Sequence, residues 1–170
     1  MTETGAVAIR EVGPADAEAL GRCHLACWAE AYTGMVPQDR LDAAVAAVDE
    51  RVSRWRAILA EFPGRRLVAD HAGEIVGFAA AGHSRDGDLG PDLELYSLYV
   101  RQAHWSTGLG HRLLAAAIGE APASLWVFRD NHRARRFYAQ HGFAPDGQEK
   151  PEPYFDRPEI RMVRYASVPG

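Results

Sequence analysis

The sequence predicts an α/β fold in which about four helices flank a mixed central sheet of six to seven strands, as one domain over residues 1–170. Short strand-like segments rich in Val, Leu and Tyr alternate with longer amphipathic segments of helical period. Apolar residues make up 47% of the chain and charged residues 25%, so the chain can bury a core. We find neither an internal repeat nor a linker, which favours one domain.

The first predicted elements are a short strand over residues 7–12 and two helices. Pro14 opens the first helix, whose apolar positions recur at helical spacing until Gly34 interrupts it. The second helix is longer and ends at Pro63. Its apolar residues are separated by three or four positions: Leu41, Val45, Val48, Val52, Trp55, Leu59 and Phe62.

A hairpin and a further strand follow. Residues 66–70 and 75–81 are typical of two strands joined by a turn at Ala72 and Gly73. Residues 83–92 are polar and rich in Gly and Asp, which predicts a loop. The Tyr-, Leu- and Val-rich segment 93–101 predicts the next strand.

Helices and strands alternate in the rest of the chain. Residues 107–120 predict a helix with its leucines on one side, and residues 124–128 a short buried strand. Asn131 can cap another helix, which Gly142 ends. Residues 143–165 predict two closing strands joined by a Pro-rich loop.

Charge and composition exclude several classes of function. The formal net charge is −4 with acids and bases mixed, whereas a nucleic-acid-binding protein shows a basic face. No apolar run approaches the roughly 18 residues of a membrane span. Residues 1–10 lack the pattern of a secretory signal. We therefore expect a cytoplasmic protein with no nucleic-acid partner and no membrane partner.

Cys23 and Cys27 lie in one predicted helix. Only His24 is close to them and no second ligand cluster follows, so we expect small buried residues and no metal site. The seven histidines of the chain show no ligand spacing.

A glycine-rich turn follows the strand over residues 93–101. Gly108 and Gly110 open a helix, where unpaired N–H groups and the helix dipole favour an anion. A Gly-x-Gly pair is also compatible with a plain strand-to-helix connection. A P-loop would need Gly-Lys-Ser/Thr, and a dinucleotide fingerprint would need glycine at Leu113. Neither alternative fits.

A second segment, from Leu125 to Phe143, continues the pattern. Its strand, its capping Asn131 and its later motif residues follow Val100 and the Gly-Leu-Gly turn in an order that resembles the GNAT superfamily of N-acetyltransferases. The resemblance extends to the N-terminal part and covers nearly the whole chain. The residues that carry it are Trp28, Ala31, Tyr32, Gly34, Pro37, Leu41, Arg54, Trp55, Val100, Gly108, Leu109, Gly110, Asn131, Ala134, Phe137, Tyr138, Gly142 and Phe143.

The resemblance implies that acetyl-CoA is the acyl donor. Its diphosphate would be bound by the main chain of the turn, and its pantetheine arm by the preceding strand and by Asn131, which can equally be only a helix cap. The turn departs from the family pattern, because Trp105 stands at its first position and Ser106 replaces a frequent glycine. The expected cofactor-binding residues are Leu98, Tyr99, Val100, Trp105, Ser106, Thr107, Gly108, Leu109, Gly110, His111 and Asn131.

The resemblance also implies the chemical roles. Tyr138 is expected to donate its proton to the leaving thiolate, although it can also simply pack its helix onto the sheet. Glu94 is the expected base, with a solvated strand glutamate or a water chain as alternatives; Tyr96, Glu30 and His83 are in reserve. Strand alternation puts Glu94, Tyr96, Leu98 and Val100 on one face and Tyr99 on the other. A bulge is expected around residues 97–99.

Other residues are expected to contact the ligands less specifically. A basic residue among Arg101, His111, Arg133, Arg135 and Arg136 is expected to meet the 3′-phosphate of coenzyme A. Trp28 and Tyr32 either pack or line the acceptor site. The loop over residues 83–92 is expected to cover its other side, where Asp86, Asp88 and Asp92 would suit a cationic amine.

The sequence thus predicts an N-acetyltransferase in which a primary amine attacks the thioester directly, since no cysteine lies in the central motifs. The alternative is a non-catalytic module that senses or binds acyl-coenzyme A. The acceptor stays open between a small-molecule amine and a protein N-terminus, and the donor between acetyl and a longer acyl group. The oligomeric state also stays open, a homodimer included.

Overall fold

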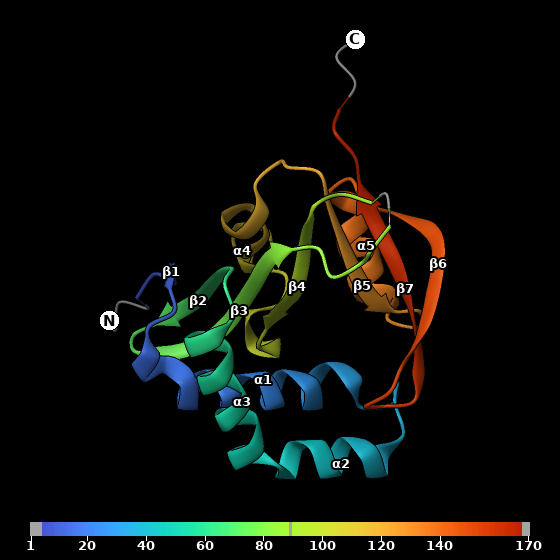
Figure 1. The fold of residues 1–170 in the computed structure, drawn as a ribbon. Helices are drawn as coiled ribbons and strands as arrows, with labels where there is room; N and C mark the ends of the chain where they lie inside the picture. The colour runs from blue at the N-terminus through green and yellow to red at the C-terminus, as the bar shows by residue number, and fades with distance from the viewer. Residues whose placement is uncertain (1–4, 89, 168–170) are drawn as a thin grey trace.

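The computed structural model describes residues 5–88 and 90–167 (Figure 1). Of residues 1–10, which lack the pattern of a secretory signal, the first four lie outside the described part. Seven strands form one sheet in the order β1-β2-β3-β4-β5-β7-β6. Short 3-10 turns lie at Pro14–Asp16 and Gln102–His104. The other elements are β1 (Ala8–Glu11), α1 (Ala17–Tyr32), α2 (Gln38–Ala46), α3 (Val48–Glu61), β2 (Arg65–His71), β3 (Glu74–His83), β4 (Leu93–Val100), α4 (Leu109–Ile118), β5 (Ala123–Phe128), α5 (His132–Gln140), β6 (Ala144–Glu152) and β7 (Arg157–Arg164).

The predicted mixed sheet is confirmed. All neighbouring strands pair antiparallel except β4 and β5, which are parallel. The hairpin of β2 and β3 turns at Ala72 and Gly73, both with positive φ, as the turn signal indicated.

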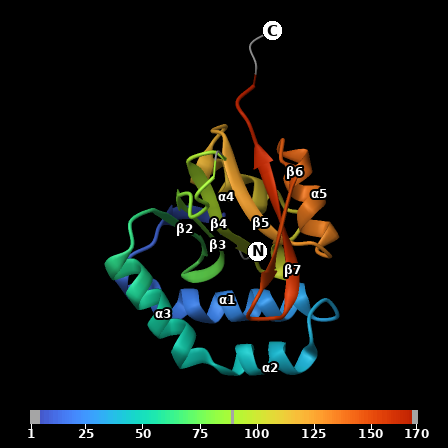
Figure 2. The ribbon, with the colours of Figure 1, turned by 45° about the vertical axis from the view of Figure 1, so that its right-hand side comes forward.

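Helices cover both faces of the sheet. Along β3, Phe78 and Ala80 pack in one cluster with α1 and Trp55 of α3, whereas Ala79 and Ala81 pack in another with the leucines of α4. Because successive strand residues point to opposite faces, α1 and α3 lie on one face and α4 on the other. Figures 1 and 2 show α1, α2 and α3 gathered together, apart from α4.

The single long helix predicted after Pro37 is wrong. Ala47 has ψ 54° and separates α2 from α3, so the described residues form five α-helices rather than about four. The break lets two apolar faces reach different clusters: Leu41 of α2 packs with Trp28 and Phe155, whereas Trp55 of α3 packs against Phe78. Phe62 does not extend the apolar face, since it is exposed.

The parallel pair β4–β5 separates soon after it begins. Only Glu94 with Ser124 and Leu95 with Leu125 are in register, at the amino ends of the two strands. Figure 1 shows the two strands lying apart over the rest of their length. The β5-facing main-chain groups of β4 beyond Leu95 therefore have no partner strand there.

A bulge in β4 lies one residue earlier than expected. Ala80 of β3 pairs with Ser97 and Ala81 with Leu95, which leaves Tyr96 as the extra residue. The extra residue reverses the alternation, so that Tyr96 and Tyr99 both pack on the α1 side and Leu98 and Val100 on the α4 side. The prediction that Glu94, Tyr96, Leu98 and Val100 share one face is therefore wrong.

Candidate active site

The turn between β4 and α4 presents a run of main-chain N–H groups. Ser106 and Gly108 have φ values of 60° and 87°, which curve the chain around a concave surface. Among the described residues, no hydrogen-bond acceptor meets the amides of residues 106–111. A cavity of about 480 Å³ opens onto this turn. Such a run of amides, together with the amino end of α4, favours a diphosphate.

The side chains of the turn have separate tasks. Ser106, which stands where the family often has glycine, adopts the left-handed conformation that glycine favours. Gly110 lies against the ring of Phe137, where an added Cβ would be in van der Waals contact at 3.4 Å. Thr107 Oγ1 donates to the main-chain oxygen of His104, and Leu109 is buried in the core. Thr107 and Leu109 are not among the residues that line the cavity.

Trp105 and Arg133 form one wall of this cavity. The Trp105 indole donates to the carbonyl of Val100 at 2.8 Å, and the guanidinium of Arg133 lies 3.5 Å from the centre of the indole ring. Burial lowers the pKa of Arg133. Arg136 lines the same cavity, whereas Arg101 pairs with Glu30 at 2.8 Å. Of the basic run, Arg133 and Arg136 are thus available to a phosphate.

A groove lies where β4 and β5 separate. It is lined by main and side chains of both strands and by the start of α5. Leu98, Val100 and Tyr138 line both this groove and the cavity at the turn, so the two adjoin each other. The three strand positions expected to bind the pantetheine arm, Leu98, Tyr99 and Val100, all line the groove.

Tyr138 lies where the groove meets the cavity. The residue is 8% exposed, and its phenolic oxygen has no hydrogen-bond partner within residues 5–88 and 90–167. Burial raises the pKa of this phenol, helped by the neighbouring Tyr99 and opposed by Arg133. Asn131 also lines the groove, and its Oδ1 accepts the amide of Ala134 at 3.1 Å. Asn131 is therefore an N-cap whatever else it contacts.

Glu94 lies away from these openings. Its side chain is buried, it lines none of the described cavities, and both of its oxygens accept hydrogen bonds from Arg85. The bulge at Tyr96 and the early pairing with β5 leave Glu94 beside the loop that follows β3. The structure does not bring the expected base to Tyr138.

The loop after β3 also differs from its expected role. Arg161 of β7 pairs with Asp86 at 3.4 Å and with Asp88 at 2.7 Å, and no loop residue lines a described cavity. Of the reserve bases, Glu30 is paired with Arg101. Ion pairing with Arg161 therefore occupies two of the three carboxylates that were expected to attract a cationic amine, those of Asp86 and Asp88.

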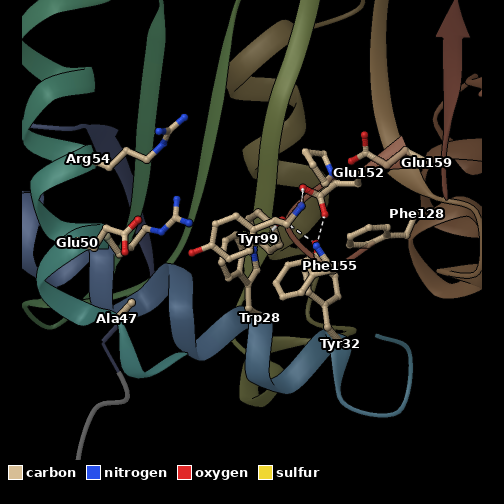
Figure 3. Close-up of a pocket in the computed structure, with 13 residues that line it drawn as sticks. Trp28, Tyr32, Ala47, Glu50, Arg54, Tyr99, Phe128, Glu152, Phe155 and Glu159 are labelled. Atoms are coloured by element: carbon tan, nitrogen blue, oxygen red, sulfur yellow. Dashed lines mark hydrogen bonds between the residues drawn. The ribbon is translucent and has the colours of Figure 1, made fainter. Parts of the chain in front are cut away.

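A second pocket, of about 390 Å³, lies on the α1 side of the sheet (Figure 3). Its floor is aromatic: the phenol of Tyr99 accepts from the Trp28 indole at 3.1 Å and lies 2.7 Å from the phenol of Tyr32. Its other lining residues are Ala47, Glu50, Arg51, Arg54, Phe128, Glu152, Pro153, Tyr154, Phe155 and Glu159. Trp28 and Tyr32 thus both pack and line a pocket.

Glu159 of β7 is a residue that the sequence analysis missed. It stands opposite Phe128 of β5 and lines both this second pocket and the groove. No described cation lies within 4.0 Å of its carboxylate and no described donor bonds to it. Burial raises its pKa, with Lys150 opposing and Glu152 assisting. The available signal was a single acid in a strand whose other charged residues are all arginines.

The openings therefore form a series across the sheet. Tyr138 joins the turn cavity to the groove, and Tyr32, Tyr99, Phe128 and Glu159 join the groove to the second pocket. The residues shared by the groove and the pocket on the α1 side are aromatic except for Glu159, and they lie where β4 and β5 separate.

Two further features concern metals and membranes. In the part of the chain that the structure describes, no group of three or more His, Cys, Asp or Glu side chains is suited to a metal ion. Cys23 and Cys27 are buried, with sulfur atoms 4.0 Å apart, as small core residues would be. None of the described helices combines the length and the apolar character that crossing a membrane requires.

Comparisons with known proteins agree with this geometry. The sequence pattern of the Acetyltransferase (GNAT) family matches residues 27–143. An uncharacterized N-acetyltransferase, YuaI, of Bacillus subtilis is 27% identical over 131 residues, which is 74% of this chain and 73% of that protein. An uncharacterized N-acetyltransferase of Mycobacterium tuberculosis is 38% identical over 87 residues, which is 48% of this chain and 53% of that protein.

Solved structures share the fold. The PaiA N-acetyltransferase from Thermoplasma acidophilum, in complex with coenzyme A, has a TM-score of 0.72 and 18% identity, covering 95% of this chain and 100% of that one. The yncA protein of Salmonella typhimurium, with its cofactor acetyl-CoA, has a TM-score of 0.66 and 21% identity, covering 98% and 99%.

Proposed function

This chain belongs to the Acetyltransferase (GNAT) family of N-acetyltransferases, and from that membership we propose that it transfers an acetyl group from acetyl-CoA directly to a primary amine. In the proposed reaction the amine nitrogen attacks the thioester carbon, a C–N bond forms and the C–S bond breaks. The amine loses a proton and coenzyme A leaves as the thiol. The acceptor is a small molecule or a protein N-terminus.

The observation that carries the proposal is the run of unpaired amides at residues 106–111, which faces a cavity that adjoins the β4–β5 groove. The diphosphate is held at the turn, and the pantetheine arm runs along β4 from Val100 past Tyr99 toward Leu98. The unpaired main-chain groups of β4 can then hydrogen-bond the arm and polarise the thioester carbonyl. Asn131, beside the groove, supports the same path.

Tyr138 assists the departure of sulfur in this proposal. A phenol has an ordinary pKa of about 10 and a thiol of about 8.5, so complete transfer of its proton to a free thiolate is uphill, and burial makes it more so. The expected acid is therefore better described as a hydrogen-bond donor. Its raised pKa keeps the phenol protonated, and its unpartnered hydroxyl can stabilise the charge that develops on sulfur.

Glu159 takes the place of Glu94 as the proposed base. An alkylammonium has a pKa of about 10, so a proton must leave before attack. Glu159 lines both the groove and the pocket on the α1 side, has no described ion-pair partner, and is made more basic by burial. An amine that enters from that pocket can pass its proton to Glu159, directly or through one water.

The test of the donor site compares two glycines of similar geometry. Gly108 and Gly147 have φ values of 87° and 90°, and an added Cβ would meet nothing within 4 Å at either. Gly108→Ala and Gly147→Ala should therefore lose similar stability. By calorimetry, only Gly108→Ala should weaken coenzyme A binding, by tenfold or more. Wild type that binds no coenzyme A, or two variants weakened alike, would refute the donor site.

A further inference from the structure

The pocket on the α1 side is lined by an arginine, Arg51, that has no described ion-pair partner. Arg51 of α3 is half-buried, and no described carboxylate lies within 4.0 Å of its guanidinium. The acceptor beside its guanidinium is the neutral phenol of Tyr154, which does not compensate the positive charge. Burial lowers its pKa, which means that the surroundings of Arg51 do not fully replace the water it has lost.

The guanidinium of Arg51 stacks against aromatic rings. The guanidinium carbon lies 4.4 Å from the ring centre of Trp28 and 6.0 Å from that of Tyr154. Stacking fixes the plane of the group but leaves the N–H groups at its edge without a charged acceptor among the described residues. Packing alone would be served by an apolar side chain of similar length, so the position of the donors calls for an anionic partner.

The opposite end of the pocket is acidic. Figure 3 shows Glu152 and Glu159 across the pocket from Glu50 and Arg54 of α3, with Trp28 and Tyr99 between them. Both oxygens of Glu152 already accept hydrogen bonds, from the amides of Tyr154 at 2.9 Å and Phe155 at 2.8 Å. Glu159 is the carboxylate without a described partner, and it faces the groove where the thioester would lie.

A bound molecule therefore meets opposite charges at two ends of an aromatic pocket. We propose that the acceptor is a small primary amine that also carries a carboxylate or a similar anion, such as an amino acid. Its amine lies toward Glu159 and its anion is bound by the edge of Arg51, in the paired geometry that a guanidinium makes with a carboxylate. This inference rests on the proposed function and names the substrate class of the same site.

A purely cationic acceptor fits less well. Glu50 also lines the pocket, but a second positive charge on the acceptor would be placed near both Arg51 and Arg54. The volume of about 390 Å³ is that of a small-molecule pocket, which favours a free amine over a protein surface.

The test compares matched acceptors in a thiol-release assay with acetyl-CoA. The panel contains the common amino acids, the carboxamide of each, in which the anion is removed, and simple alkylamines. For at least one amino acid, wild type should give kcat/KM at least tenfold above that of its carboxamide. Arg51→Gln should lower kcat/KM for that amino acid tenfold or more, mainly through KM, and leave the carboxamide within threefold.

Arg56→Gln is the matched control, since Arg56 is on the same helix, is exposed and lines no described cavity. It should behave as wild type, and thermal unfolding should show that both variants are folded. Coenzyme A binding, measured separately, tests the proposed function. Three outcomes overturn the inference when acetyl-CoA binds: only amines without an anion are acetylated, no amine of the panel is acetylated, or acid and carboxamide react alike. In each case the proposed donor site is unaffected.

Discussion

Arg85 holds the buried carboxylate of Glu94 from two directions. Its main-chain amide donates to Oε1 at 3.0 Å, and its guanidinium donates to Oε2. The Glu94 side chain is 1% exposed, whereas that of Arg85 is 63% exposed. The pair therefore fastens the loop after β3 to the first residues of β4, close to where β4 meets β5.

Glu94→Gln should consequently act on stability rather than on proton transfer. Glutamine keeps the shape but loses the charge that Arg85 compensates, so the free energy of unfolding should fall by about 2 kcal/mol. Urea titration measures this loss. The midpoint of the acid limb of kcat/KM should stay where it is in wild type. A shift of this midpoint in Glu94→Gln would show that Glu94 acts as the base.

Glu159→Gln should have the opposite pattern. The carboxylate must be ionised to accept a proton, and burial raises its pKa, so kcat/KM of wild type should fall as the pH drops through that raised value. The variant should lose this limb, and its rate at pH 8 should be lower by about 100-fold. Rates from pH 5 to pH 9 provide the profile, since ionisation of the amine itself affects both proteins alike.

The exposed Glu120→Gln provides the control for that experiment, because Glu120 makes no described ion pair or side-chain hydrogen bond. Unchanged binding of coenzyme A by Glu159→Gln separates a lost base from a damaged donor site. Retention of the acid limb in Glu159→Gln would rule out the assignment.

Local spacing explains what the sequence predicts well. The Gly-Leu-Gly turn, the helix that follows Asn131 and the position of Tyr138 on it all depend on residues within one or two helical turns. The structure puts Gly108, Gly110 and Tyr138 around one continuous opening. The hairpin at Ala72 is equally local.

Long-range contacts explain what the sequence analysis missed. Glu159 reaches the groove only because β7 inserts between β5 and β6 in the sheet. The bulge at Tyr96 depends on register with β3, and one extra residue is enough to move Leu98 to the other face. The apolar spacing continues through Ala47 in the sequence, yet the helix breaks there. The break follows from tertiary packing, because α2 and α3 pack in different hydrophobic clusters.

Tyr138→Phe should reduce turnover without weakening the fold. The phenolic oxygen has no hydrogen-bond partner in the described part of the chain, so the free energy of unfolding should change by less than about 0.5 kcal/mol. Loss of the donor to sulfur should lower kcat by about 10- to 100-fold, and the dissociation constant of coenzyme A should stay within threefold. Steady-state kinetics and calorimetry measure the two effects. Equal kcat in both proteins would remove Tyr138 from the mechanism.

His24 should make the fold sensitive to acid. Nδ1 of this buried ring accepts the Trp55 indole N–H at 3.1 Å, which requires a neutral ring, and burial, with a contribution from Arg51, lowers its pKa to about 3. An unfolded histidine takes up a proton below about pH 6.5, so stability is complete above that pH and falls as the pH drops toward 3. Between pH 7.5 and pH 5, protonation of unfolded His24 should lower the free energy of unfolding by about 2 kcal/mol. The loss accumulates over the roughly 1.5 pH units from 6.5 to 5, at about 1.36 kcal/mol per unit. His24→Asn should be less stable at pH 7.5 but should lose about 2 kcal/mol less than wild type on acidification, by urea titration at both pH values. An equal loss in both proteins would show that other groups cause the acid sensitivity.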